Sequence, residues 1–437
     1  MIRLLIIAGL MVGAALSSCS GPDPQAQRSA VDRVAESYVK LSLVLGQYDP
    51  DYVDAYTGPE EWKPAPLPEG EDHVIPAADI AAQADGLVAE LDAVYKSVLS
   101  DLEQRRVKFL RRHILSLKAR AELVGGKKMT FDEESKALYD AVAPPADIAA
   151  LDSALAELEA LVPGDGSLSA RVEEYRKDFA IPKDKIDAVF TRAIEEARSR
   201  TLPHIPLPEG ESFDKEYVTG VSWGAYNWYK GDYRSLIQVN VELPVRISSP
   251  IGLAVHEGYP GHHVQNVLVE KNMLNDNGFM EYTVQPLYCP QATLNEGGAN
   301  LGVRLVFTEE ERIEFIRDVL FPMAGLDPAR AEEYLKFESL TRNLRGARTE
   351  AVRKYLDGEW TREMASAFVQ KYSLMTEARA DMYMRFGEKY RSYVVTYVVG
   401  LQMVKDYIER EAGDDTAKRW ELMRELYAVP HLPSDIE

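Results

Sequence analysis

Apolar residues recur at helical spacing through most of this chain, and a strand pattern is clear in only one segment. Residues 234–243 (RSLIQVNVEL) alternate apolar and polar side chains, as in a β-strand with one buried face. We therefore predict a mainly α-helical protein with a small β-sheet just before residue 250. The strongest helical patterns, separated by turn-rich segments such as the expected long loop at 47–76, cover 77–123, 146–162, 185–200, 328–355, 362–385 and 393–412.

The N-terminal segment has the features of an export signal. MIRLLIIAGLMVGAALSSC contains one basic residue, a short apolar run and small residues before Cys19. The apolar run is too short for a good membrane span. Leu16–Cys19 (LSSC) resembles the bacterial lipobox, whose Cys is lipidated and becomes the first mature residue. We expect a signal peptide at 1–18 and a tether at 19–30; an ordinary signal peptide with an incidental Cys is the alternative.

The same segment predicts the location of the protein. A lipidated Cys19 would anchor the chain to a membrane of the bacterial cell envelope. Ser20 follows it, where lipoproteins retained at an inner membrane often carry Asp, so we expect the outer membrane, facing the periplasm. Acylation would leave Cys289 without a disulfide partner, and we expect it to be a small buried side chain.

The charge of the chain excludes one class of partner. Among 437 residues, 50 are Lys or Arg and 70 are Asp or Glu, which gives a formal net charge of −20. Nucleic-acid-binding proteins usually present a basic face, and no basic stretch stands out here. We therefore expect no nucleic-acid partner.

Residues 255–265 read VHEGYPGHHVQ and place three of the seven His residues beside Glu257. In the zinc motif H-E-x-x-H, two His four residues apart share a helix face and bind one metal ion, and the Glu activates a water. Here Pro260 occupies the position four residues after His256. On a straight helix, His263 would lie roughly 10.5 Å further along the axis, too far for one zinc, and His262 would point to the opposite side.

An interruption of the helix would restore a metal site. Pro260 lacks a backbone donor and Gly261 tolerates unusual dihedral angles. If these two residues bulge out, His262 takes the position of the second zinc ligand. We therefore predict His256 and His262 as zinc ligands and Glu257 as general base. His263 is the alternative second ligand or a substrate contact, and a surface turn without function is the remaining interpretation.

The third ligand is expected downstream. Glu296 lies in LNEGGANLG, and Asn295-Glu296-Gly297 resembles the place where many gluzincin aminopeptidases carry their third zinc ligand. The alternative is a carboxylate that only stabilises a helix start. Glu270 and Glu281 are weaker candidates because no such pattern flanks them.

These motifs resemble one protein family. The segment His256–His263, with the pattern HExxPGHH, followed by Glu296-Gly297, is similar to the bacterial domain-of-unknown-function family 885. The similarity extends over most of the mature chain and is sharpest from residue 226 to 302. It implies an elongated, mainly helical, gluzincin-like zinc metallopeptidase fold, often lipid-anchored, with the small sheet next to the zinc-site helix.

Two further segments resemble this family with departures. Thr396–Gly400 (TYVVG) is similar to its Ser-Tyr-Lys-x-Gly segment, with Val398 in place of Lys. Tyr397 is therefore predicted to donate a hydrogen bond to the oxyanion of a tetrahedral intermediate, unless it is a structural Tyr. Arg353 and Asp357 resemble an Arg…Asp-Thr-Gly segment, but the His that usually closes it is absent.

Together these observations predict an envelope-anchored zinc-dependent peptidase that hydrolyses peptide bonds. The strand at 234–243, with Val239 as a substrate contact, is expected to line the cleft and to pair through its edge with an extended peptide. A helical N-terminal region at 31–205 and a catalytic region at 206–437 are expected to form one continuous unit. A zinc amidase acting on cell-wall or other amides, and a non-catalytic peptide-binding lipoprotein, are the alternatives.

Overall fold

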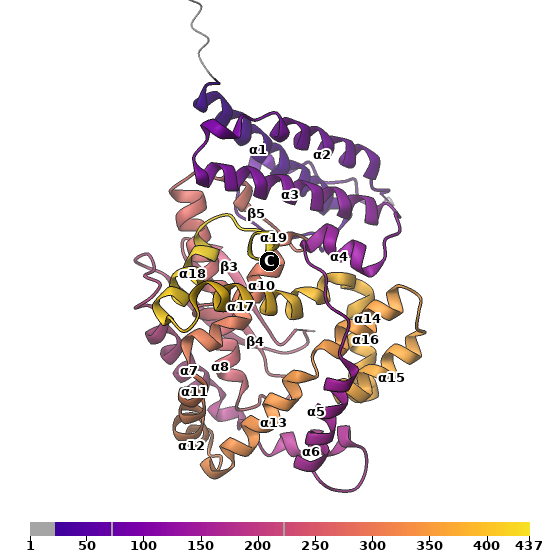
Figure 1. Cartoon of the computed structure of the whole chain (residues 1–437), viewed down its shortest axis with the longest axis vertical. Coiled ribbons are helices and arrows are strands. Elements are labelled where there is room, and N and C mark those ends of the chain that lie inside the picture. The colour runs from indigo at the N-terminus through magenta and orange to yellow at the C-terminus, as the bar shows by residue number, and fades with distance from the viewer. Residues whose placement is uncertain (1–21, 71–72, 222) are drawn as a thin grey trace, which may run out of the picture.

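The computed structural model describes residues 22–70, 73–221 and 223–437, and these residues form a mainly helical, elongated molecule (Figure 1). The sequence prediction of a mainly α fold with a small sheet is therefore confirmed. The helices of eight or more residues are α1 (Pro24–Tyr48), α2 (Ala77–Asp92), α3 (Asp101–Val124), α4 (Phe131–Tyr139), α5 (Ile148–Leu161), α6 (Leu168–Lys177), α7 (Ile186–Thr201), α9 (His262–Val269), α10 (Pro290–Val306), α13 (Ala331–Asn343), α14 (Gly346–Leu356), α15 (Arg362–Ser373), α16 (Glu377–Tyr390), α17 (Thr396–Ala412) and α18 (Thr416–Ala428). Shorter helices are α8 (Ser249–Leu253), α11 (Glu309–Phe315), α12 (Phe321–Ala324) and α19 (Pro433–Ile436).

Several segments predicted as one helix are two. The segment 77–123 contains α2 and α3, because Ser100 and Glu103 form a capping box that begins α3: the Ser100 side chain accepts from the Glu103 backbone N–H, and Glu103 accepts from that of Ser100. The segment 362–385 contains α15 and α16, separated by Leu374 in the left-handed region and by the N-cap Thr376. These caps are local signals that the apolar periodicity does not contain.

Two large apolar clusters fill the molecule. One lies among α1, α2 and α3, and it also includes Tyr288 and Tyr393. The other extends from α5 and α7 through α10 and α13 to the C-terminal helices. Each cluster combines residues from before and after residue 205. Helices α10 and α17 pack against each other in the middle of the molecule (Figure 1). Their backbones approach so closely that a Cβ atom at Gly297 would collide with the carbonyl of Gly400.

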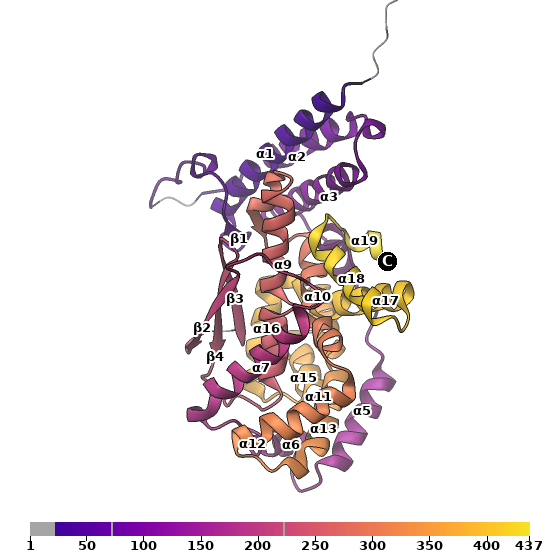
Figure 2. The same cartoon turned by 90° about the vertical axis from the view of Figure 1, so that its left-hand side faces the viewer.

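The sheet next to the candidate site has three strands, β2 (Ser212–Val218), β3 (Ala225–Gly231) and β4 (Arg234–Asn240), in the order β2-β4-β3. Strand β4 pairs parallel to β2 and antiparallel to β3, and α9 runs beside the sheet (Figure 2). The predicted strand at 234–243 is thus present, but the prediction that its edge is free for a peptide is wrong. β4 is the central strand: β2 occupies one edge, and the segment 225–231 folds back through a turn at Asp232 and Tyr233, both with positive φ, to occupy the other.

Two other strands join distant parts of the chain. β1 (Val53–Tyr56) lies in the segment expected to be a loop, and it pairs antiparallel with β5 (Val284–Pro286).

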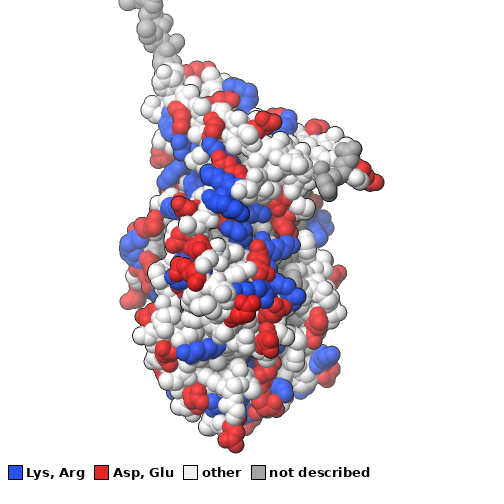
Figure 3. Space-filling model, turned by 90° about the vertical axis from the view of Figure 1, so that its right-hand side faces the viewer, with Lys and Arg blue, Asp and Glu red and all other residues white. Residues whose placement is uncertain are grey.

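Acidic and basic side chains are interspersed on the face drawn in Figure 3. Among the described residues, no helix is both long and apolar enough to cross a bilayer.

Candidate metal centre

The two predicted histidine ligands come together through a widened and then interrupted helix. Residues Ala254–Gly258 form a π-helical turn, in which Tyr259 N–H donates to the carbonyl of Ala254 at 3.0 Å. Gly261 N–H then donates to the carbonyl of Val255 at 2.9 Å, and α9 begins at His262. The ring centroids of His256 and His262 are 4.7 Å apart. The structure therefore places His262, six residues along the chain, beside His256.

Glycine is required at position 261. Its φ and ψ angles are −76° and −139°. A Cβ atom at this position would collide with the carbonyl oxygens of His256 and Val255. The backbone can therefore fold back tightly only because residue 261 has no side chain, and this return of the chain carries His262 to His256.

Glu296 of α10 completes a three-residue cluster with the two histidines. Its Oε2 lies 3.5 Å from His256 Nε2 and its Oε1 lies 3.7 Å from His262 Nε2. Ligands held at about 2.0–2.1 Å in a tetrahedron are about 3.3–3.4 Å apart, so these separations are close to those of a zinc site. Oε2 of Glu296 is buried and has no hydrogen-bond partner among the residues that the structure describes, which leaves it available to a cation.

Glu257 also lies within this cluster. One carboxylate oxygen of Glu257 and one ring nitrogen from each of His256 and His262 lie within 4.8 Å of one another. Geometry alone therefore allows Glu257 or Glu296 as the third ligand. We favour Glu296 because its carboxylate has one oxygen within 3.5 Å of His256 Nε2 and the other within 3.7 Å of His262 Nε2, and because Oε2 has no hydrogen-bond partner among the described residues.

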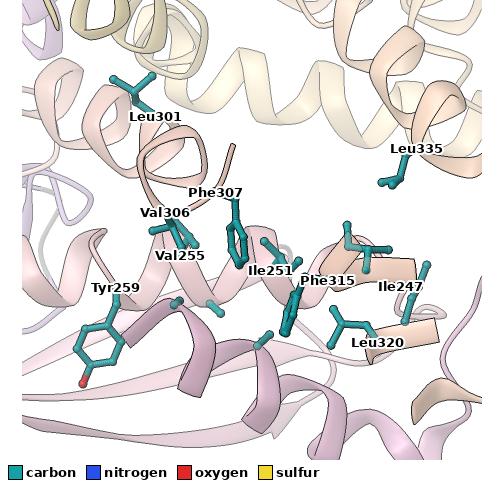
Figure 4. Packing of buried hydrophobic residues seen from close by; sticks show 14 of the residues in the cluster. Ile247, Ile251, Val255, Tyr259, Leu301, Val306, Phe307, Phe315, Leu320 and Leu335 are labelled. Carbon is teal, nitrogen blue, oxygen red and sulfur yellow. The ribbon is translucent and has the colours of Figure 1, made fainter. Parts of the chain in front are cut away.

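Apolar packing holds α10 against the histidine-bearing segment. Ile251 and Val255 precede His256, and they pack with Val306 and Phe307 at the end of α10 (Figure 4). All four side chains are almost fully buried. The position of Glu296 relative to the histidines thus depends on core packing between segments separated by some thirty residues of sequence.

A hydrogen bond to the other ring nitrogen orients His262. Its Nδ1 lies 2.9 Å from Oε1 of Gln265, and Nε2 of Gln265 donates to the carbonyl of Asn295 at 2.8 Å. This arrangement leaves Nε2 of His262 pointing toward Glu296. Such a partner on the other ring nitrogen is the usual companion of a metal-binding histidine, because it fixes the ring and its tautomer.

His263 faces away from the cluster. Its side chain is fully buried, with Nδ1 at 2.9 Å from Ser235 Oγ and Nε2 at 3.0 Å from Glu211 Oε2. Both ring nitrogens are therefore engaged between α9 and the sheet. The structure does not bring His263 to the metal cluster or to the cavity wall, so neither predicted role of this residue, as second ligand or as substrate contact, is carried further.

Burial and mutual charges shift the pKa values of Glu257, Glu296 and His262. Burial raises the pKa of Glu257 to about 7, His262 opposes this rise and Glu296 adds to it. Burial also raises the pKa of Glu296, with His262 opposing. For His262, burial lowers the pKa, but the Glu296 and Glu257 carboxylates outweigh it and the net shift is upward. Burial and the neighbouring charges therefore raise the pKa of all three groups.

We expect Glu257→Gln to stabilise the metal-free protein above about pH 7 and to change its stability little near pH 4.5. Between these values the folded state keeps a proton on Glu257 that the unfolded state releases, so wild-type stability falls as the pH rises. Gln carries no such proton. From 4.5 to about 7, the shift corresponds to roughly 3 kcal/mol. Urea denaturation of both proteins with a chelator, from pH 4.5 to 8, measures the difference; a variant that is less stable at pH 8 would contradict the burial argument.

The cluster opens into a cavity of about 2250 Å³. His256, Glu257, His262 and Glu296 line it, as does Tyr397 of α17. Tyr397 is 42% exposed, because it faces the open cavity. The surrounding cavity walls limit its hydration and raise its pKa, and the Glu296 carboxylate raises it further, which places the hydroxyl in the field of the site.

Two other predicted residues have different surroundings. Val239 lines the cavity from β4 but is 3% exposed, so it contributes a buried part of the wall. Arg353, from the second segment that resembles family 885, bonds to Asp132 at 3.0 Å and to Glu350 at 2.8 Å. Arg353 is thus buried in structural ion pairs and does not line the cavity.

Asn227 of β3 is a site residue that the sequence reasoning missed. Its Nδ2 donates to the carbonyl of Glu257 at 2.7 Å, and its Oδ1 is buried without a partner. It also lines the cavity. The aromatic run around it, SWGAYNWYKGDY, was visible as a change in composition, but nothing in that run indicates contact with Glu257.

Comparisons with solved structures place this fold beside bacterial candidate lipoproteins. One, from Colwellia psychrerythraea, has a TM-score of 0.50 and 13% sequence identity, over 85% of this chain and 69% of that chain. Another, of unknown function, from Shewanella oneidensis, has a TM-score of 0.41 and 14% identity, over 94% and 79% of the two chains. No protein-family model and no curated protein sequence matches the chain, so its place in family 885 stays a prediction.

Proposed function

We propose that this chain is a zinc-dependent peptidase in which His256, His262 and Glu296 hold one zinc ion. The observation that supports the proposal is that the two oxygens of the Glu296 carboxylate lie 3.5 Å and 3.7 Å from Nε2 of His256 and of His262, and that Oε2 is buried without a hydrogen-bond partner among the described residues. A bound zinc ion would supply a Lewis acid for the scissile carbonyl and would lower the pKa of water.

Glu257 is the general base of this proposal. Burial raises the pKa of its carboxyl to about 7 in the metal-free protein, and positive charge at the site would bring it down. It takes a proton from the attacking water and passes it to the nitrogen of the leaving amine. Tyr397 of α17 donates its hydroxyl hydrogen to the oxyanion that develops on the attacked carbonyl.

The edge of β3 offers a place for an extended peptide. Asn240 N–H donates to the carbonyl of Gly224 at 2.9 Å, and the register then turns the main-chain groups of Ala225 and Asn227 away from β4. Among the described strands, none pairs with this outer edge. Ala225 and Asn227 line the cavity, so a peptide added as a further strand would pass Glu257. The volume exceeds the 300–1,000 Å³ usual for small-molecule pockets, which favours an oligopeptide.

The protein is proposed to act at a membrane of the bacterial envelope. The lipobox-like segment with Cys19 lies outside the described residues, and the two structural neighbours are candidate lipoproteins. Lipid on Cys19 would tether the helical body, in our proposal to the outer membrane and facing the periplasm.

Metal analysis and peptide hydrolysis test the proposed activity. The purified mature protein is expected to contain about one zinc per chain, and chelation is expected to abolish cleavage of a mixed peptide library, with zinc restoring it. Mass spectrometry of the library identifies the cleaved bonds. Cleavage of cell-wall amides alone would assign an amidase instead, and peptide binding without any cleavage would assign a binding lipoprotein.

A further inference from the structure

Three arginines follow one another at three-residue spacing where α13 meets α14. They are Arg342, Arg345 and Arg348. The backbone at this junction has bonds between residues three apart: Arg345 N–H donates to the carbonyl of Arg342 at 3.1 Å, and Arg348 N–H to that of Arg345 at 3.2 Å. In such a 3₁₀-like turn, residues three apart lie above one another. The three side chains therefore start from one side of the junction.

Nearby carboxylates compensate this group only in part: burial lowers the pKa of Arg345, and the Glu338 charge opposes that shift without reversing it. Within residues 22–70, 73–221 and 223–437, no Asp or Glu forms an ion pair with Arg342, Arg345 or Arg348, and Nε of Arg348 is buried without a partner. The two nearby acids serve other arginines. Glu338 lies 3.8 Å from Arg246 and accepts from Ser248, and Glu309 pairs with Arg312 at 2.7 Å.

Mutual repulsion indicates that these positive charges are close together. Burial lowers the pKa of Arg342, the Arg312 and Arg345 charges lower it further, and Glu309 and Glu338 oppose this without reversing it. Burial also lowers the pKa of Arg348, and Arg345 adds to this effect. Arg342 is half-buried and Arg345 is exposed, and both line the cavity, so an anion that enters the cavity can reach their guanidinium groups. The chain has a net charge of −20, so acidic residues are abundant, yet none of the described ones forms an ion pair with these arginines.

The group opens toward the candidate metal centre. Arg342 and Arg345 line the same cavity as His256 and Glu296. A molecule in this cavity can therefore contact the arginines through an anionic group and the metal ligands through another part of its length.

We propose that Arg342 and Arg345 bind a carboxylate of the peptide substrate. The proposal rests on the peptidase function proposed above and specifies its substrate class. A guanidinium group binds a carboxylate through two parallel N–H···O bonds, which is stronger and more directional than a single contact. The carboxylate is either the C-terminus of the peptide or an Asp or Glu side chain, and the two sources are separable.

The test uses binding, which needs no turnover. Three fluorescein-labelled tetrapeptides serve as probes: Ala-Ala-Ala-Ala as free acid, the same peptide as C-terminal amide, and Ala-Ala-Ala-Glu as C-terminal amide. Fluorescence anisotropy is measured on the full mature chain carrying Glu257→Gln, with and without zinc. The free acid is expected to bind about tenfold or more tightly than the plain amide. Equal affinity of the plain amide and the glutamate amide assigns the site to the C-terminus, and tight binding of the glutamate amide assigns it to a side chain.

Variants connect the preference to the arginines. Arg345→Gln and Arg342→Gln are each expected to remove most of the preference, and Arg345→Lys to keep part of it, because Lys retains the charge without the fork. The matched control is Arg330→Gln, whose arginine pairs with Asp178 at 2.9 Å outside the cavity lining, and it is expected to keep the full preference. Unchanged melting temperatures confirm that the variants fold.

The outcomes separate this proposal from the peptidase activity. Equal binding of all three probes by the parent protein overturns the carboxylate site even if the wild-type enzyme cleaves peptides. A preference that survives both Arg→Gln substitutions overturns it as well. If Arg345→Gln loses the preference for the carboxylate probe while the wild-type protein cleaves no peptide, the carboxylate site is supported and the peptidase function is overturned.

Discussion

Replacing His262 by Ala is expected to lower zinc affinity by more than about 100-fold, whereas His263→Ala keeps the metal. His262 Nε2 lies 3.7 Å from Glu296 and beside His256, so its loss removes one of three protein ligands. Loss of a residue that only supports a ligand typically costs 10–100-fold, and loss of the ligand itself should exceed this. Competition titration with a zinc chelator measures both affinities.

His263→Ala is the matched control because it removes the same side chain from the next position. It deletes hydrogen bonds to Ser235 and Glu211, so a loss of roughly 1–3 kcal/mol in the free energy of unfolding is expected. If His263→Ala loses the zinc while His262→Ala retains it, the folded-back arrangement at Gly261 is wrong for the metal-bound protein.

Glu257→Gln is expected to keep the zinc and to lower kcat/KM by roughly 10²–10⁴-fold, the range that general acid–base catalysis contributes. The amide has nearly the same shape as the carboxyl group but cannot accept a proton from water. The metal keeps its ligands, because His256, His262 and Glu296 are unchanged in this variant. Steady-state kinetics on a cleaved library peptide, together with metal analysis of the same sample, measures the effect.

Glu242→Gln supplies the control for this experiment. Glu242 lines the same cavity with an exposed side chain that accepts a bond from Gly220 N–H at 2.9 Å. Its substitution makes the same change of charge away from the metal ligands, and little change in kcat/KM is expected. Full activity of Glu257→Gln would remove the proposed mechanism. Loss of zinc from that variant would make Glu257 the third ligand in place of Glu296.

Local sequence accounts for most of the helical architecture. Apolar periodicity predicts α5 and α7 within two residues of their observed ends, because a helix depends on neighbours three and four residues away. It misses the break at Ser100, which the capping pair with Glu103 encodes equally locally. Pro260 and Gly261 likewise specify an interruption of the histidine helix, since one lacks a donor and the other lacks a Cβ.

What the sequence determined by itself is thus the helical class, the strand at 234–240 and the place where the histidine helix is interrupted. The tertiary structure decided which groups meet there. It joined Glu296 to the two histidines through the packing of α10, turned His263 into the sheet, covered β4 with β3 and brought Arg345 to the cavity. These placements depend on contacts between segments far apart in the chain, whose distances follow from the packing of whole elements and leave no mark in local periodicity.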